Sequence, residues 1–212
     1  MVEDHAALGE ALLFALGFEA DIDVVGLAPT VTAALEMTAA SRPDVVLMDV
    51  RLPDGNGIDA TSRVLELHPG AAVVVLTAHA DPVFALRAAE AGAAGFVAKD
   101  VRIARIVGAA RAVRAGEVAV EPTVLRSLLA QAAVGQDGAG AAAAGDLLPE
   151  QVAVLDLLRE GLGSDGVAAK LGVDGAEAEA AVADTLRALG ARSRLEALVL
   201  AARRGLVKPG AG

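Results

Sequence analysis

The sequence predicts two folded units: a doubly wound α/β unit built on a parallel sheet, and a small all-α unit after it. Three observations lead to this prediction. Over residues 1–120, short β-branched runs alternate with alanine-rich amphipathic stretches, and apolar strands separated by helices are typical of a parallel sheet covered on both faces. A glycine- and alanine-rich segment then interrupts the pattern. From Leu147 onward, apolar residues recur only at helical spacing.

The elements of the α/β unit follow one another in a regular order. Leu8, Leu12 and Leu16 recur every four residues, which predicts an opening helix over Ala6–Leu16. Four apolar runs have the length of buried strands: Val24–Gly26, Val45–Met48, Val73–Leu76 and Gly95–Ala98. Helical spacing with polar outer faces is found at Thr30–Ser41, Gly57–Leu67, Pro82–Ala91 and Val101–Ala115.

The change of composition places the domain boundary. Gln131–Gly145 offers little to bury beyond methyl groups, and its glycines favour a flexible linker. We therefore predict a first domain over residues 1–125, a linker over 126–146 and an all-α domain over 147–212. Four helices in about 60 residues are near the lower limit of independent stability.

Composition also excludes several classes of protein. The sequence contains no cysteine, which excludes disulfides and Cys-based zinc sites. Its formal charge of −10 provides no overall basic field for nucleic acid or anionic lipid. No apolar run approaches the roughly 18 residues that span a bilayer, and no secretion signal is evident. We expect a soluble, cytoplasmic protein with no membrane partner.

Polar residues stand where the predicted strands end. Asp49, Thr77 and Lys99 each follow a strand directly, and Glu3 and Asp4 precede the first helix. The carboxyl ends of parallel strands form the ligand crevice of an α/β sheet. Clustered carboxylates suit Mg²⁺, and an ionised aspartate can attack phosphorus to form an acyl phosphate. A plain loop salt bridge between Asp49 and Lys99 is the alternative, but the joint placement of all five residues favours phosphoryl chemistry.

These stretches resemble the receiver domains of two-component response regulators. The matching segments are Val2–His5, PDVVLMDVRLPDGNGIDA around Asp49, VVVLTAHAD around Thr77, and GAAGFVAKD ending beside Lys99. The resemblance implies a flavodoxin-like sheet and a sensor histidine kinase as partner. It makes Asp49 the phosphoacceptor. It assigns Mg²⁺ binding to Glu3, Asp4, Asp49 and the Arg51 carbonyl, and the switch to Thr77, Phe96 and Lys99.

One feature departs from the family pattern. The family has a strand of about five or six residues before the acidic pair, whereas this sequence offers only Met1 and Val2 there. We expect this first strand to be truncated, which would expose the edges of its neighbours. A version extended upstream should then be more stable.

The second unit resembles the LuxR/NarL-type helix-turn-helix domain. The matching segments are LLPEQVAVLDLLREGL, VAAKLGV, TLRALGARSR and LEALVLAARRG. Together the two resemblances imply a DNA-binding transcriptional regulator that forms a homodimer on phosphorylation. The candidate DNA contacts are Lys170, Glu177, Glu179, Ala180, Arg187, Arg192 and Arg194.

The predicted recognition helix is acidic, which leaves an alternative open. Carboxylates near phosphate lose the counterion-release contribution to affinity, so Glu177 and Glu179 predict weakened DNA binding. The alternative is a phosphorylatable receiver whose degenerate helix-turn-helix acts through protein contacts.

Two enzymatic interpretations fail on the residues. Gly161–Gly166 spells a G-x-G-x-x-G pattern, but a dinucleotide site needs a strand before the glycines, and here the preceding residues are helical. Haloacid-dehalogenase-like phosphatases place a second aspartate two residues after the nucleophile, where this sequence has Arg51. We expect no enzyme, and at most slow self-dephosphorylation.

Overall fold

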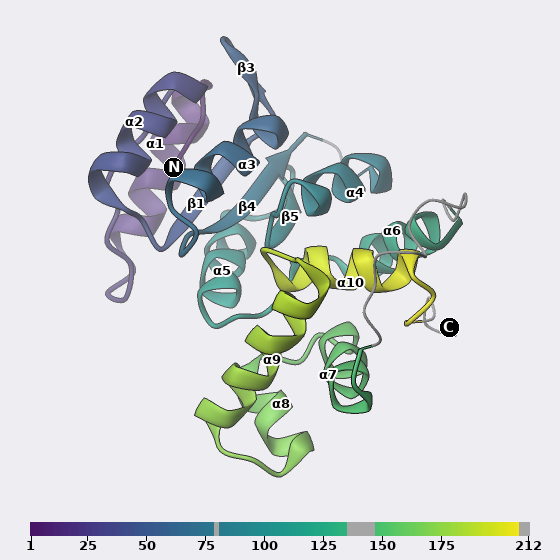
Figure 1. Ribbon diagram of the computed structural model, residues 1–212. Helices are drawn as coiled ribbons and strands as arrows, with labels where there is room; N and C mark the ends of the chain where they lie inside the picture. Colours follow the sequence, from purple (N-terminus) through teal and green to yellow (C-terminus); the bar gives the residue numbers. More distant parts are fainter. Residues whose placement is uncertain (79–80, 135–146, 208–212) are drawn as a thin grey trace.

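The predicted α/β unit is confirmed in the computed structural model, which describes residues 1–78, 81–134 and 147–207 (Figure 1). A parallel sheet has the strand order β1 (Val45–Asp49), β4 (Ala72–Thr77), β5 (Gly95–Ala98) and β6 (Ala119–Val120). The apolar runs of β1 and β4 are buried on both faces. This is why continuous apolar sequence, rather than alternation, identified them.

Helices cover both faces of the sheet. One face packs against α5 (Ile103–Arg114), on which α1 (Ala6–Gly17) lies. The other face packs against α3 (Gly57–Leu67) and α4 (Pro82–Glu90), with α2 (Val31–Ser41) beside α3. Two apolar cores therefore fill the space on the two sides of the sheet.

The start of the chain takes the place of a short central strand. Val2 forms one parallel bridge to Met48 of β1 and another to Ala28. The prediction of a strand at Val24–Gly26 is wrong, because a strand needs a ladder of backbone hydrogen bonds. Among the described residues, the only segment that hydrogen-bonds to the backbone along this stretch is Met1–Glu3. Its backbone hydrogen bonds reach the carbonyl oxygen of Gly26 and both backbone groups of Ala28, and these are too few to form a strand.

A small hairpin that the sequence did not reveal follows β1. Its strands are β2 (Arg51–Leu52) and β3 (Gly55–Asn56). Asp54 in its turn accepts hydrogen bonds from the backbone nitrogens of Val31, at 2.7 Å, and Thr32, at 2.9 Å. The hairpin thus caps the N-terminus of α2, although Asp54 lies more than twenty residues further along the chain.

The C-terminal part is helical, as predicted. After α6 (Pro122–Val134), its helices are α7 (Pro149–Arg159), α8 (Ser164–Leu171), α9 (Gly175–Leu189) and α10 (Arg194–Arg203). Helix α6 extends into the segment predicted as linker, because its buried Leu128 and Leu129 join the core between α4 and α10. The remainder of that linker, residues 135–146, lies outside the described residues.

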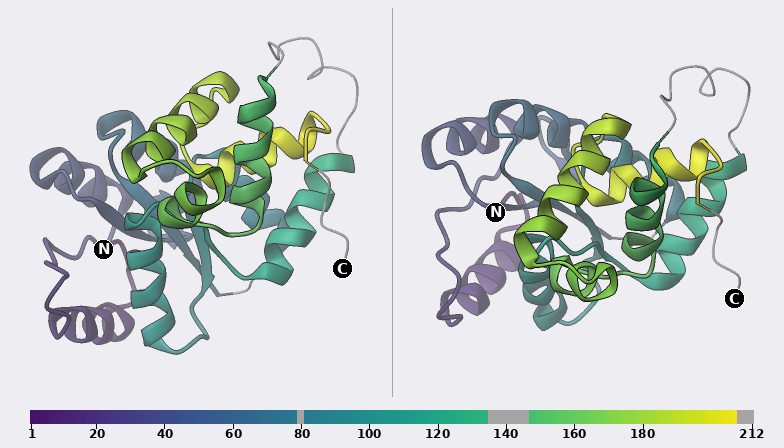
Figure 2. Two further views of the ribbon diagram at one scale, coloured as in Figure 1. Left: turned by 90° about the horizontal axis from the view of Figure 1, so that it is seen from below. Right: turned by 60° about the horizontal axis from the view of Figure 1, so that its bottom comes forward.

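The helical unit packs on the α/β unit rather than standing apart from it. Helix α10 lies beside α6 in the views of Figures 1 and 2 and also contacts α4, and one apolar core runs through both units. The buried Ser193 hydroxyl donates a 2.8 Å hydrogen bond to the carbonyl oxygen of Ala93. Within the described residues, no helix is long and apolar enough to cross a membrane.

Candidate phosphoacceptor site and helix-turn-helix face

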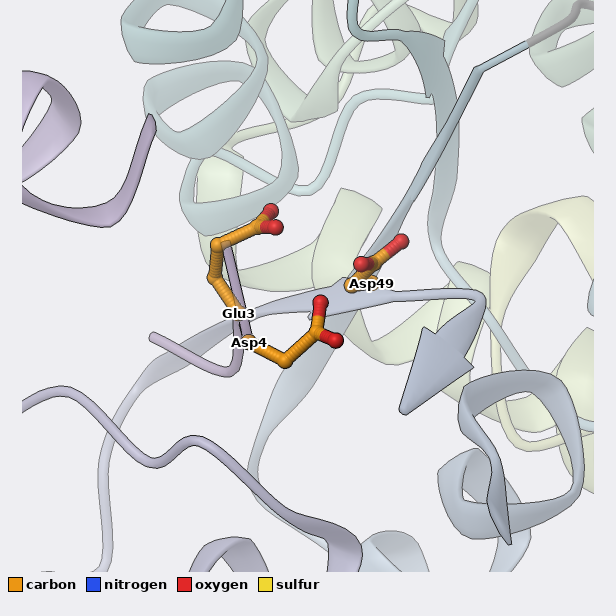
Figure 3. Close-up of side chains that lie close together, drawn as sticks. All are labelled: Glu3, Asp4 and Asp49. Carbon is orange, nitrogen blue, oxygen red and sulfur yellow. The ribbon is translucent and has the colours of Figure 1, made fainter. Parts of the chain in front are cut away.

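Three carboxylates meet at the carboxyl edge of the sheet. Asp49 is the last residue of β1, and Glu3 and Asp4 follow Val2 in the neighbouring sheet position. Each contributes a carboxylate oxygen, and these oxygens all lie within 4.8 Å of one another (Figure 3). Residues from the start of the chain and from the end of β1 thus come together, as the strand-end argument predicted.

Lys99 joins two of these carboxylates. Its Nζ atom lies 2.7 Å from Asp49 Oδ2 and 2.7 Å from Glu3 Oε2. The position of the Lys99 backbone is fixed as well, because its nitrogen donates a 2.7 Å hydrogen bond to the carbonyl oxygen of Thr77. The ammonium therefore bridges the first strand position and β1 from the end of β5.

Burial makes the carboxylate of Glu3 costly to ionise. The side chain is fully buried, and this burial, supported by the negative charge of Asp49, raises the pKa of Glu3 above its ordinary value. The hydrogen bond and charge of Lys99 act in the opposite direction. The positive charge of Lys99 thus offsets part of the free-energy cost of removing these carboxylates from water.

The backbone around Asp49 also shapes the site. The Arg51 nitrogen donates to Asp49 Oδ1 at 3.3 Å, and the Gly57 nitrogen donates to the carbonyl oxygen of Val50 at 2.9 Å. These bonds fold the hairpin and the start of α3 closely against the end of β1. The Asp49 carboxylate is consequently held between a backbone donor on one oxygen and an ammonium on the other.

The remaining predicted receiver residues lie on the next two strands. Thr77 ends β4 and is buried, and it stands beside Ala98 in the strand register. Phe96 lies within β5 and is buried in the core. Thr77 is therefore at the sheet edge that carries Asp49 and Lys99, whereas Phe96 lies further back along β5.

The acidic cluster has the donor chemistry that suits Mg²⁺. All three side chains offer oxygen ligands, which a hard cation prefers. Asp4 is exposed, whereas Glu3 and Asp49 are buried, so a cation can reach the cluster from solvent. Glu3, Asp4 and Asp49 are thus the residues that would hold it.

The candidate DNA contacts divide into two groups. Lys170 of α8 and Ala180 of α9 are exposed, and Arg187 is exposed while pairing with Asp184. Glu177 closes a capping box with Asp174 at the start of α9. The other three candidates are Glu179, Arg192 and Arg194, which contact one another or the α/β unit.

Arg192 and Arg194 make contacts within the protein. Arg192 pairs with Glu196 and donates to the carbonyl oxygen of Glu90 at the end of α4. Arg194 is 9% exposed and donates to Glu179 Oε1 at 3.2 Å. Sequence spacing alone could not reveal the contacts of Arg192 with Glu90 and of Arg194 with Glu179, because each joins residues that are distant along the chain.

Comparisons with known proteins agree with this architecture. Residues 1–111 match the family described as response regulator receiver domain. The DNA-binding transcriptional activator DevR/DosR of Mycobacterium tuberculosis is 33% identical over 204 residues, which cover 95% of this chain and 92% of that protein. The oxygen regulatory protein NreC of Staphylococcus carnosus is 27% identical, with 98% and 97% covered.

Solved structures show the same likeness. A LuxR-family two-component response regulator from Aurantimonas has a TM-score of 0.57 and 32% identity, covering 61% of this chain and 93% of that one. The RcsB response regulator of Salmonella typhimurium shares the fold over both units, with a TM-score of 0.56, 22% identity and 90% of each chain covered. The chain therefore belongs to the LuxR-type response regulators of two-component systems.

Proposed function

We propose that Asp49 accepts a phosphoryl group from a sensor histidine kinase and that this controls DNA binding by the C-terminal helices. One observation carries the proposal: the Asp49 carboxylate lies at the sheet edge with Lys99 at 2.7 Å and with Glu3 and Asp4 beside it. This arrangement combines a nucleophile, a fixed cation and a set of oxygen ligands. It matches the residue types on which the receiver resemblance depends.

The transfer is an in-line substitution at phosphorus. An Asp49 carboxylate oxygen forms the new P–O bond while the P–N bond to the kinase imidazole breaks, and the imidazole leaves with the electron pair and takes up a proton. Mg²⁺ held by Glu3, Asp4, Asp49 and the Arg51 carbonyl would neutralise the phosphoryl oxygens. Lys99 and Thr77 would then contact the phosphoryl group, and Phe96 would change position with them. Water attack on the acyl phosphate would return Asp49 to its free form slowly.

The output step follows from the relatives and from the exposed face of the helix-turn-helix. DevR/DosR is described as a DNA-binding transcriptional activator. In this chain Lys170, Glu177, Ala180 and Arg187 are exposed on α8 and α9, and they are the proposed contacts. We propose residues 1–125 as the phosphorylated unit and 147–212 as the DNA-binding unit, with homodimer formation on phosphorylation.

The decisive experiment combines phosphorylation with DNA binding. The chain is incubated with a labelled small phosphodonor with and without Mg²⁺, for the wild type, Asp49→Asn and the control Asp59→Asn, an exposed carboxylate on α3. Label that depends on Mg²⁺, survives in Asp59→Asn and disappears in Asp49→Asn is expected. Binding to promoter DNA is then measured by fluorescence anisotropy across a salt series. Label retained by Asp49→Asn would contradict the assignment of the phosphoacceptor.

A further inference from the structure

Glu179 is the least expected residue on the proposed DNA-binding face. It lies in the first half of α9, and its side chain is 57% exposed. An unpaired carboxylate there would repel DNA phosphates and weaken association. The contacts around Glu179 change this expectation.

Glu179 is part of a three-residue network. Arg194 Nη2 donates to Glu179 Oε1 at 3.2 Å and to Ser164 Oγ at 2.8 Å, and Ser164 Oγ also donates to Glu179. Ser164 begins α8, Glu179 lies on α9, and Arg194 begins α10. The network therefore ties together the three helices that set the orientation of α9.

The Arg194 side chain is buried between α9 and the receiver. It is only 9% exposed, and burial lowers the pKa of its guanidinium, while Glu179 and the nearby Glu117 raise that pKa. Gly116 of the receiver approaches so closely that a Cβ there would lie 2.7 Å from Arg194 Nη2. A guanidinium enclosed in this way can act on DNA only through the residues that it touches.

We infer that Arg194 is a positioning residue for DNA binding, which neutralises Glu179 and fixes α9 against α8 without contacting DNA itself. The inference depends on the proposed DNA-binding function. The physical reason is that an ion pair of this kind removes most of the field of Glu179 at the distance of a phosphate. The other nearby glutamate of α9, Glu177, is directed back to the Asp174 backbone nitrogen at 3.3 Å. Each of the two acidic side chains in the first half of α9 thus makes at least one contact within the protein.

A double-mutant cycle on DNA affinity tests this role. The full chain is compared as wild type, Arg194→Met, Glu179→Gln and the double variant, at low temperature and across a salt series. Arg194→Met should weaken binding about tenfold, or about 1.4 kcal/mol, because Glu179 then faces DNA unpaired. In the Glu179→Gln background the same change should weaken binding less than about twofold.

The pair Arg187–Asp184 provides the matched control. It also lies on α9, and both side chains are exposed. Arg187→Met should weaken binding by a similar factor whether residue 179 is Glu or Gln, and should reduce the salt slope by about one, as expected for a phosphate contact. Urea unfolding of each variant establishes that the measured affinities belong to folded protein. Should Arg194→Met not fold, Arg194→Lys keeps the charge and enters the same cycle with a smaller expected loss.

Two results would overturn the inference. An equal loss of affinity on Arg194→Met in both backgrounds, with a smaller salt slope, would make Arg194 a direct phosphate contact. An equal loss with an unchanged slope and a matching loss of stability would leave it a structural residue only. Absence of DNA binding by the wild type, phosphorylated or not, would instead refute the proposed function, and the role of Arg194 with it.

Discussion

Gly57 and Asp49 approach each other more closely than any side chain at position 57 would allow. A Cβ atom built on Gly57 would stand 1.8 Å from the Asp49 carbonyl oxygen and 2.9 Å from Met48 Cγ. The backbone conformation of Gly57 lies outside the left-handed region, so glycine is required here for space. The start of α3 can therefore rest directly on the end of β1.

Replacing Gly57 by alanine should disturb the site without touching any of its functional side chains. The added methyl group meets the Asp49 carbonyl oxygen most closely, at 1.8 Å, so the Asp49 peptide must move. Such overpacking costs about 1–3 kcal/mol or more. We expect Gly57→Ala to reduce the rate of Asp49 phosphorylation by a small-molecule donor at least about tenfold.

Gly108→Ala is the matched control for this prediction. Gly108 lies in α5, and a Cβ there would meet nothing within 4 Å. Alanine is favoured over glycine inside a helix by about 1 kcal/mol, so this variant should be phosphorylated normally and be slightly more stable. Normal phosphorylation of Gly57→Ala would show that the close contact with Asp49 has no bearing on the site.

Removal of the Lys99 ammonium should expose the cost of the buried carboxylates. Glu3 is fully buried and Asp49 nearly so, and Lys99 Nζ is 2.7 Å from both. Breaking a buried ion pair on one side costs about 3–5 kcal/mol, so Lys99→Met should lower the free energy of unfolding by about 3 kcal/mol in EDTA. Mg²⁺ should restore part of it, because a cation among the carboxylates stabilises the folded state.

Urea denaturation with and without Mg²⁺ measures both effects. In a Glu3→Gln background, Lys99→Met should cost distinctly less, because no buried carboxylate at position 3 loses its partner. An equal cost in both backgrounds, together with no response to Mg²⁺, would contradict the electrostatic explanation.

The sequence predicted most elements whose own residues determine them, and failed where an element depends on a partner elsewhere in the chain. Val73–Leu76 was predicted as a strand from its continuous apolar character, and β4 extends one residue beyond it on either side. Val24–Gly26 has the same apolar character but forms no strand. A strand also needs a neighbouring segment that supplies a ladder of backbone hydrogen bonds, and on this side Met1–Glu3 reaches only Gly26 and Ala28. Helix α6 was missed although Leu125, Leu128 and Leu129 recur at helical spacing, since the glycine-rich run beside it dominated the composition.

The candidate site was more predictable than its supporting contacts. Asp49 and Lys99 follow from the rule that parallel strands end at one edge. The capping of α2 by Asp54 and the pairing of Glu179 with Arg194 follow from no such rule. Each joins side chains on elements whose relative placement only the packed structure fixes.

Asp54 should give the stability of the receiver a dependence on pH at the acidic end. Hydrogen bonds from the backbone nitrogens of Thr32 and Val31 lower the pKa of Asp54 below its ordinary value of 3.8. A lowered folded-state pKa means that the stabilisation is present above about 3.8 and is lost as pH falls through the folded-state value. The difference in melting temperature between the wild type and Asp54→Asn should therefore be largest above about pH 3.8 and shrink as pH falls below that value.

Thermal unfolding from about pH 7 to about pH 3 checks this dependence. Glu36→Gln serves as control, because Glu36 is an exposed residue of α2, the helix that Asp54 caps. Its difference from the wild type should stay small throughout. A constant difference for Asp54→Asn down to the lowest pH would mean that its charge does not stabilise α2.

Ser193 offers the most direct test of the contact between the two units. Its hydroxyl accepts from the Glu196 nitrogen at 3.1 Å, which caps α10, and donates to the buried carbonyl oxygen of Ala93 at 2.8 Å. Ser193→Ala should lower the free energy of unfolding by about 2 kcal/mol, because it removes a cap and leaves a buried carbonyl unsatisfied. Thr30→Ala removes only the N-cap bond from the Ala33 nitrogen at the start of α2 and should cost about 1 kcal/mol. Urea denaturation of the full chain compares the two, and equal costs would show that the bond to Ala93 adds nothing to the packing of α10 on the receiver.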